Sequence, residues 1–109
     1  MKYMFLIFGH ADAETVPRDA PCLVFGDTAR QMPNFVTSHA LRPPETARTV
    51  SVRDGSAVVT DGPFIDTKEQ LGGYFVMELP DREAALEFAA TIPGASDGHV
   101  EVRALVDFD

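Results

Sequence analysis

The chain opens with an apolar run, Tyr3 to Phe8, in which aromatic and aliphatic side chains follow one another without polar alternation. Such a run is typical of a strand that is covered on both faces, and it predicts a central place in a sheet. Near the end of the sequence, residues 100–106 alternate apolar and polar positions. This alternation predicts a last strand with one apolar face.

Two segments carry apolar residues at helical spacing. The first covers residues 21–32, with Asp19 as its candidate capping residue and Cys22 among its packed apolar residues. The second covers residues 82–92 and follows Asp81, a residue type that favours the N-terminal cap of a helix. The sequence therefore predicts two helices of about three turns each.

The middle of the sequence predicts strands. Residues 34–41 form a short apolar and polar segment that prolines end, since proline cannot donate to a sheet ladder. Residues 48–53 and 56–60 flank Asp54-Gly55, which is a strong signal of a tight hairpin. Residues 74–79 predict one more strand.

These elements follow in the order strand, helix, strand, hairpin, strand, helix, strand within one domain, residues 1–109. The order predicts an α+β fold, a ferredoxin-like sandwich whose antiparallel sheet carries two helices on one face. Two short helices leave the other face uncovered, although the first strand is apolar on both sides. We therefore expect a homodimer in which a second copy covers that face.

Composition narrows the choice of partners. The net charge of −8 repels phosphate backbones and anionic lipids, so we expect neither nucleic acid nor a membrane as partner. The single cysteine, Cys22, excludes an intrachain disulfide. No apolar stretch is long enough for a membrane span or for the core of a signal peptide. These features favour a cytoplasmic protein.

The segment 61–74 concentrates glycine, charged and aromatic residues between the hairpin and the next strand. Asp61 is placed to accept a hydrogen bond from the backbone of its own turn. Asp66 and Glu69 have the spacing of a capping box, which predicts a short helical turn. Gly72-Gly73 is expected to end that turn.

The same segment resembles the signature of the DGPF-domain branch of the YCII-related proteins. The matching residues are Asp61-Gly62-Pro63-Phe64, Asp66, Thr67-Lys68-Glu69 and Leu71-Gly72-Gly73-Tyr74. The opening residues, residues 41–44 and residues 100–103 also resemble the family, so the resemblance covers nearly the whole chain. It implies a ferredoxin-like fold that dimerises through its sheets, as in dimeric α/β barrels. It also implies a small bacterial protein without an established reaction, in a family with some members linked to alternative sigma factors.

One histidine is a candidate for acid–base chemistry. His39 stands where the family commonly has a glutamate, and an imidazole changes charge near neutral pH. A nearby carboxylate such as Asp61 would orient it as a general base. The alternatives are a solvent-facing or structural role for His39 and a purely local turn role for Asp61.

The family motif also implies ligand-binding residues within the segment: Gly62, Phe64, Lys68, Glu69 and Tyr74. Lys68 and Glu69 are suited to an anionic or polar ligand, although charged residues on an exposed turn usually contact only solvent. The two aromatic residues are suited to a pocket wall, and the alternative is a place in the core or at a dimer interface.

The sequence predicts no metal site and no cofactor. His10, Asp12 and Glu14 alternate along an extended segment, but without a second set of ligands this spacing is a weak metal signal. No phosphate-cradling glycine loop and no nucleophile turn occur in the sequence.

Three interpretations of function remain open. The first is a dimer that binds or transforms a small organic molecule in a cleft beside residues 61–74, by proton transfer if it is an enzyme. The second is a regulatory module without catalytic activity whose partner is a protein such as an alternative sigma factor. In the third, the segment serves only dimerisation.

Overall fold

A computed structural model describes residues 1–9 and 16–108 of the chain. Six strands and three α-helices are assigned in this part, together with one short 3-10 helix, η1. Their bounds in chain order are β1 Lys2–Gly9, α1 Pro21–Arg30, β2 Phe35–Ala40, η1 Pro44–Thr46, β3 Arg48–Arg53, β4 Ser56–Asp61, β5 Gln70–Glu78, α2 Arg82–Thr91, α3 Gly94–Asp97 and β6 His99–Ala104.

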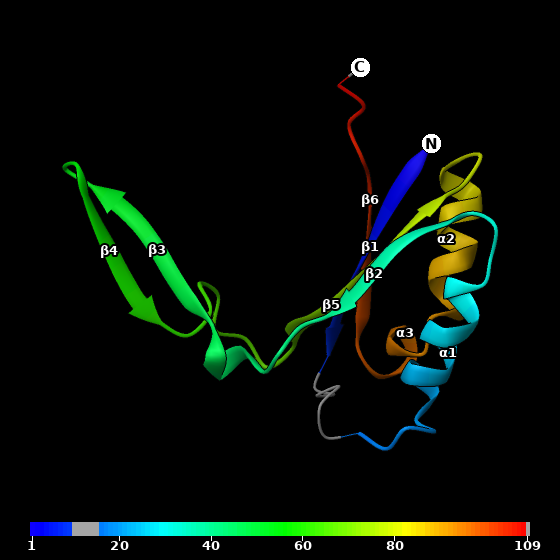
Figure 1. Ribbon diagram of the computed structural model, residues 1–109, viewed down its shortest axis with the longest axis horizontal. Helices are drawn as coiled ribbons and strands as arrows, with labels where there is room; N and C mark the ends of the chain where they lie inside the picture. The colour runs from blue at the N-terminus through cyan, green and yellow to red at the C-terminus, as the bar shows by residue number, and fades with distance from the viewer. Residues whose placement is uncertain (10–15, 109) are drawn as a thin grey trace.

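Four strands form one antiparallel sheet in the order β2-β5-β1-β6. Strand β1 lies inside this sheet, because Phe5 pairs with Phe75 on one side and with Val102 on the other. The predicted central place of the first strand is therefore confirmed. Figure 1 shows helices α1 and α2 on the same face of the sheet. The result is an α+β architecture compatible with the ferredoxin-like β-α-β-β-α-β pattern.

The core lies between this sheet and the two helices. The side chains of Phe5 and Met77 are fully buried, and Ala85 and Ala89 present the packed side of α2 to them. Phe5 meets the ring of Phe88 edge to face, with ring centroids 5.0 Å apart. Small alanines on the helix and aromatic rings on the strands thus let the two layers approach closely.

The two helices differ in how they begin. Asp81 caps α2 as predicted, since its Oδ1 accepts a hydrogen bond from the backbone N–H of Ala84 at 2.8 Å. The predicted capping role of Asp19 in α1 is wrong, because the helix begins after Ala20 without any side-chain cap. Pro21 occupies the first turn, where it has no N–H to satisfy and its fixed φ already suits a helix.

The packed face of α1 is the predicted one except at its first residue, since Ala29 is buried and Phe25 and Met32 pack against the core. Gly26 and Ala29 are its buried residues, and the ring of Phe25 packs on that of Phe75. Cys22 is exposed, so its predicted place among the packed residues is wrong. It lies in the first turn of the helix, and the side of α1 that faces the sheet passes through other residues.

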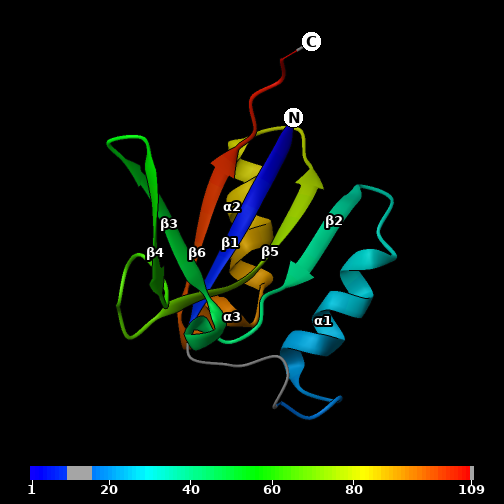
Figure 2. The same cartoon turned by 60° about the vertical axis from the view of Figure 1, so that its left-hand side comes forward.

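The predicted hairpin is confirmed. Asp54 and Gly55 both have positive φ, 53° and 77°, as a tight two-residue turn requires. Strands β3 and β4 form a separate sheet of two strands instead of extending the main one. They project as an arm from the side of the main sheet that faces away from the helices (Figures 1 and 2).

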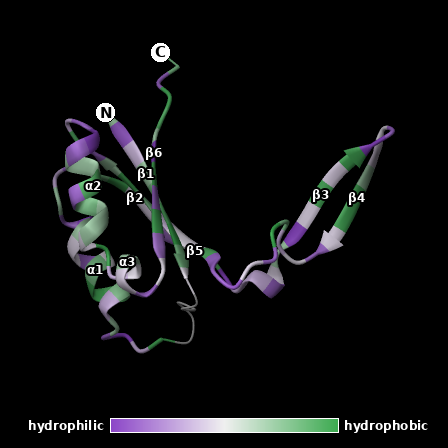
Figure 3. Cartoon of the chain, turned by 180° about the vertical axis from the view of Figure 1, so that it is seen from behind, coloured by the Kyte–Doolittle hydropathy of each residue, from purple (hydrophilic) through white to green (hydrophobic). Residues whose placement is uncertain are grey.

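The arm has one apolar face and one largely polar face. Cross-strand pairing places Val50 opposite Val59 and Val52 opposite Ala57 on the same side, because strand side chains alternate. All of these valines are exposed, and Figure 3 shows hydrophobic residues on both strands of the arm. A hairpin of two strands is marginal in water on its own, so this apolar face is a candidate contact surface.

The predicted helical turn at residues 66–69 is wrong. The segment is irregular, and the side-chain amide of Gln70 donates to the carbonyl oxygens of Ile65 and Thr67 at 2.9 Å each. Gly73 lies inside β5 and not at a helix end, so this strand begins earlier than predicted. A Cβ at Gly73 would lie 2.9 Å from the carbonyl oxygen of His39, so glycine allows β2 to approach here.

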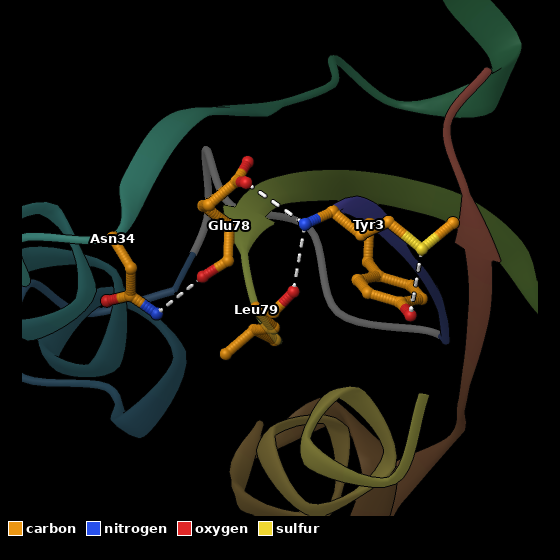
Figure 4. Close-up of polar contacts among 5 residues, drawn as sticks. Tyr3, Asn34, Glu78 and Leu79 are labelled. Atoms are coloured by element: carbon orange, nitrogen blue, oxygen red, sulfur yellow. Dashed lines mark hydrogen bonds and ion pairs between the residues drawn. The ribbon is translucent and has the colours of Figure 1, made fainter. Parts of the chain in front are cut away.

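The end of β5 is tied to two other parts of the chain (Figure 4). The amino group of Met1 donates to the Glu78 carboxylate at 3.0 Å and to the Leu79 carbonyl at 3.1 Å. The side-chain amide of Asn34 donates to the Glu78 carbonyl at 3.1 Å. These bonds join the chain before β1 and before β2 to the same strand end.

Within the described ranges, none of the helices is both long enough and apolar enough to span a bilayer.

Candidate functional site

A pocket of about 250 Å³ lies where the arm joins the main sheet. Its walls come from the ends of β1 and β5 and from the two connections to the arm, which we name the outgoing linker, residues 41–47, and the returning linker, residues 62–69. The lining residues are Gly9, Leu41, Arg42, Pro43, Pro44, Glu45, Lys68, Gln70, Leu71 and Gly72. The predicted ligand-binding segment therefore contributes one wall of this pocket.

The charged side chains of the pocket come from both linkers. Arg42 and Glu45 belong to the outgoing linker, and Lys68 belongs to the returning one. Among the described lining residues, two basic side chains and one acidic side chain therefore meet at this pocket. Lys68 was predicted as a ligand-binding residue and does line the pocket. Arg42 and Glu45 were not among the predicted site residues.

A histidine–carboxylate pair joins the returning linker to β6, and neither of its residues lines the pocket. Nδ1 of His99, the first residue of β6, is 2.7 Å from Oε1 of Glu69 in the returning linker. The Glu69 side chain is 32% exposed and that of His99 is 80% exposed. Sequence reasoning named Glu69 as a ligand-binding residue and missed His99.

The turn before β6 holds His99 close to β1. A Cβ at Gly98 would overlap the carbonyl oxygen of Phe8 and would lie 3.0 Å from the Cα of Gly9. Only glycine therefore fits this approach of the two backbones. Phe8 then pairs with His99, and the neighbouring Gly9 pairs with Gln70 of β5.

His39 lies at a different place, on the edge strand β2. It is exposed, and its ring lies 5.7 Å from that of Tyr74, its cross-strand partner. Tyr74 is half-buried and, by alternation with the buried Phe75, faces away from the helices. The predicted ligand-binding residue Tyr74 is thus placed beside His39, and neither residue lines the pocket.

Asp61 lies at the base of the arm. It ends β4, and its carboxylate pairs with Nε of Arg48 across the hairpin at 3.2 Å. The turn that follows is held by other groups, since Thr49 Oγ1 donates to the Gly62 carbonyl at 2.9 Å. Gly62 has a φ of 88°, which favours glycine. Asp61 is therefore paired with Arg48, whereas His39 lies beside the ring of Tyr74.

Phe64 and the weak metal motif complete the predicted set. The Phe64 residue is 84% exposed, so the alternative of a core position for it is wrong for the single chain. The motif formed by His10, Asp12 and Glu14 lies outside the described residues. In the remaining part of the chain, no group of three or more histidine, cysteine or carboxylate side chains is arranged to hold a metal ion.

These features define an α+β domain with a pocket at the root of an arm and with a histidine–carboxylate pair between the returning linker and β6. Residues 1–109 match the YCII-related domain family, so the chain belongs to that family. The chain is also similar to an uncharacterized protein of Rhizobium meliloti (strain 1021), with 40% identity over 67 residues. The match covers 60% of this chain and 54% of the relative, so the chain spans about half the length of that protein.

Proposed function

We propose that the protein binds, and transforms by proton transfer, a small anionic organic molecule in the pocket between the two linkers. The observation that carries the proposal is the place of the exposed Lys68 in the wall of a pocket, in a chain whose net charge is −8. Lys68 belongs to the segment that carries the family resemblance. The protein would act without a cofactor, as a homodimer in the cytoplasm.

The size of the pocket limits the ligand. Pockets for drug-sized molecules usually measure about 300–1,000 Å³. The pocket here measures about 250 Å³, so it suits a compact molecule. Glu45 adds one acceptor to the two basic groups, and it would favour a ligand that also carries a hydroxyl or amino group. A small hydroxy, keto or amino carboxylate meets these conditions.

A titration with small carboxylates tests the pocket. We expect lactate, pyruvate or a similar acid to shift the amide NMR signals of Lys68 and Gly72 at millimolar concentrations. Lys68→Ala should weaken this binding at least about fivefold, since a charge-assisted hydrogen bond to an anion is worth about 1.5–3 kcal/mol. Its melting temperature should stay close to that of the wild type, because an exposed charge contributes little to stability.

Arg103→Ala is the matched control for this titration. Arg103 is an exposed basic residue on β6, and it does not line the pocket. If both variants weaken carboxylate binding equally, general charge attraction explains the binding. The pocket proposal then fails, and it fails also if no carboxylate shifts the pocket signals.

The proposed dimer would cover the uncovered surfaces of the chain. Met4 and Leu6 of β1 lie on the face of the sheet without helices, and they are only half-buried. The arm, which carries the other apolar surface, projects on the same side of the sheet (Figure 2). Burial of both surfaces against a second copy would remove two apolar patches from water in one symmetric contact.

Light scattering tests the dimer. We expect a mass of about twice 11.9 kDa at micromolar concentration. Val59→Lys should raise the dissociation constant at least about tenfold, because Val59 is 60% exposed on the apolar face of the arm and a lysine there would bury a charge. Val58→Lys is the control, since this neighbour points to the opposite face of the same strand.

A monomer of 11.9 kDa in the wild type would contradict the dimer. The exposed arm would then favour the alternative function, a regulatory module that binds another protein such as an alternative sigma factor. Equal effects of the two lysine variants would exclude the apolar face of the arm from the contact.

A further inference from the structure

We infer that Glu69 and His99 form the proton-transfer pair of this protein, with Nε2 of His99 as general base toward a ligand in the pocket. The inference rests on the proposed function, because it needs a small carboxylate bound between the linkers. It assigns the chemistry to a histidine other than the one that the sequence analysis selected.

The contact between the two side chains sets the state of the imidazole. An ionised carboxylate only accepts hydrogen bonds, so the 2.7 Å contact places a proton on Nδ1 of His99. The neutral ring then carries its lone pair on Nε2. The His99 side chain is 80% exposed in the single chain, which leaves Nε2 open to an incoming molecule. His99 lies on the same face of the sheet as Met4 and Leu6, so the proposed dimer must leave this end of β6 uncovered. Glu69 also stabilises the imidazolium that forms when Nε2 takes up a proton.

The backbone that carries Glu69 is held by hydrogen bonds within the returning linker. Glu69 is only 32% exposed, and its backbone carbonyl accepts a hydrogen bond from Thr67 Oγ1 at 2.8 Å. The following Gln70 anchors the linker through its side-chain amide. Such preorganisation is what a general base needs and what a solvated pair of flexible side chains lacks.

The sheet register places His99 next to the pocket. Gly9 and Gln70 both line the pocket and pair with each other, and the adjacent position of β1, Phe8, pairs with His99. Neighbouring strands lie about 4.8 Å apart and successive residues about 3.4 Å apart. The backbone of His99 therefore lies about one strand and one residue from Gly9. Since neither His99 nor Glu69 lines the pocket, the proposed ligand has to extend out of the pocket to reach Nε2.

The proton transfer balances without another reactant. The base removes a proton from a carbon next to a carbonyl group, so that a C–H bond breaks and the Nε2–H bond forms. The electron pair of the broken bond moves onto the carbonyl oxygen as an enolate. Return of the proton to carbon or oxygen regenerates the neutral histidine. Lys68 and Arg42 are placed to hold the carboxylate end of the molecule.

Deuterium exchange into pyruvate in D₂O tests the inference, because pyruvate carries a carboxylate and acidic protons next to a carbonyl. We expect the wild-type protein to accelerate exchange of the methyl protons. His99→Gln should lower this acceleration about 100-fold or more, as expected for loss of a general base. Glu69→Gln should also lower it. The matched control is Glu101→Gln, a carboxylate on the same face of β6 that should leave the rate unchanged.

A second measurement reports on the pair without any turnover. Nitrogen NMR should find the His99 ring of the wild type with its proton on Nδ1, and Glu69→Gln should shift the ring toward the other tautomer. A ring with its proton on Nε2 in the wild type would overturn the inference.

Two further outcomes separate the inference from the proposed function. If pyruvate shifts the Lys68 signal but exchange is no faster than in buffer, or if exchange survives in His99→Gln, the pair is overturned and the binding site stands. If exchange is lost only in His39→Gln, His39 is the general base, and the assignment of this role to His99 and Glu69 is wrong. If pyruvate shifts no pocket signal and causes no exchange, both proposals fail.

Discussion

Replacement of Phe5 by alanine is expected to lower the free energy of unfolding by about 3–5 kcal/mol. Phe5 is fully buried in the centre of the sheet and meets the ring of Phe88. Its removal takes apolar surface out of the core and leaves a cavity between the sheet and α2, which the small Ala85 and Ala89 cannot fill.

Urea unfolding at one fixed protein concentration measures this loss. Phe64→Ala is the matched control, because it makes the same chemical change at a side chain in a residue that is 84% exposed. We expect it to change stability by less than about 0.5 kcal/mol. Similar losses for both variants would contradict the position of the core described here.

Gly98→Ala is expected to destabilise the protein by about 3 kcal/mol, the upper end of the usual cost of overpacking. The added Cβ would overlap the carbonyl oxygen of Phe8, and a backbone atom cannot rotate away as a side chain can. Strand β6 must therefore move away from β1 at its first residues. This movement would also separate His99 from Glu69.

Thermal unfolding and the tautomer of His99 report the two effects of this substitution. Gly9→Ala serves as control, since a Cβ at Gly9 would meet no atom within 4 Å. It should leave both the stability and the His99 tautomer near those of the wild type. If Gly98→Ala were as stable as Gly9→Ala, the close approach of β1 and β6 would not exist in solution.

The main elements of the fold were predictable because their signals are local. Residues 3–8, the turn at Asp54-Gly55 and the cap at Asp81 each carry their information within a few residues, and the structure confirms all three. Local patterns were misleading where a distant contact decided the conformation. Gly73 resembled part of a helix end in the sequence, whereas in the structure it provides room for the backbone of His39.

The site was less predictable for the same reason. Lys68 and Glu69 were identified by their motif, but the partner of Glu69 lies thirty residues further along the chain. One signal for His99 was present in the sequence. It precedes the alternating strand residues 100–104 and falls on the polar side of that pattern. Its meeting with Glu69 depends on the sheet order and on the path of the returning linker, which no local pattern encodes.

Residues of both linkers line the pocket, and these linkers lead directly into β3 and out of β4. A ligand that contacts both linkers and favours one distance between them would also favour one orientation of the hairpin. By thermodynamic reciprocity, whatever holds the arm changes the affinity of the pocket by the same factor. Binding of a ligand in the pocket and contact of the arm with a partner would therefore influence each other.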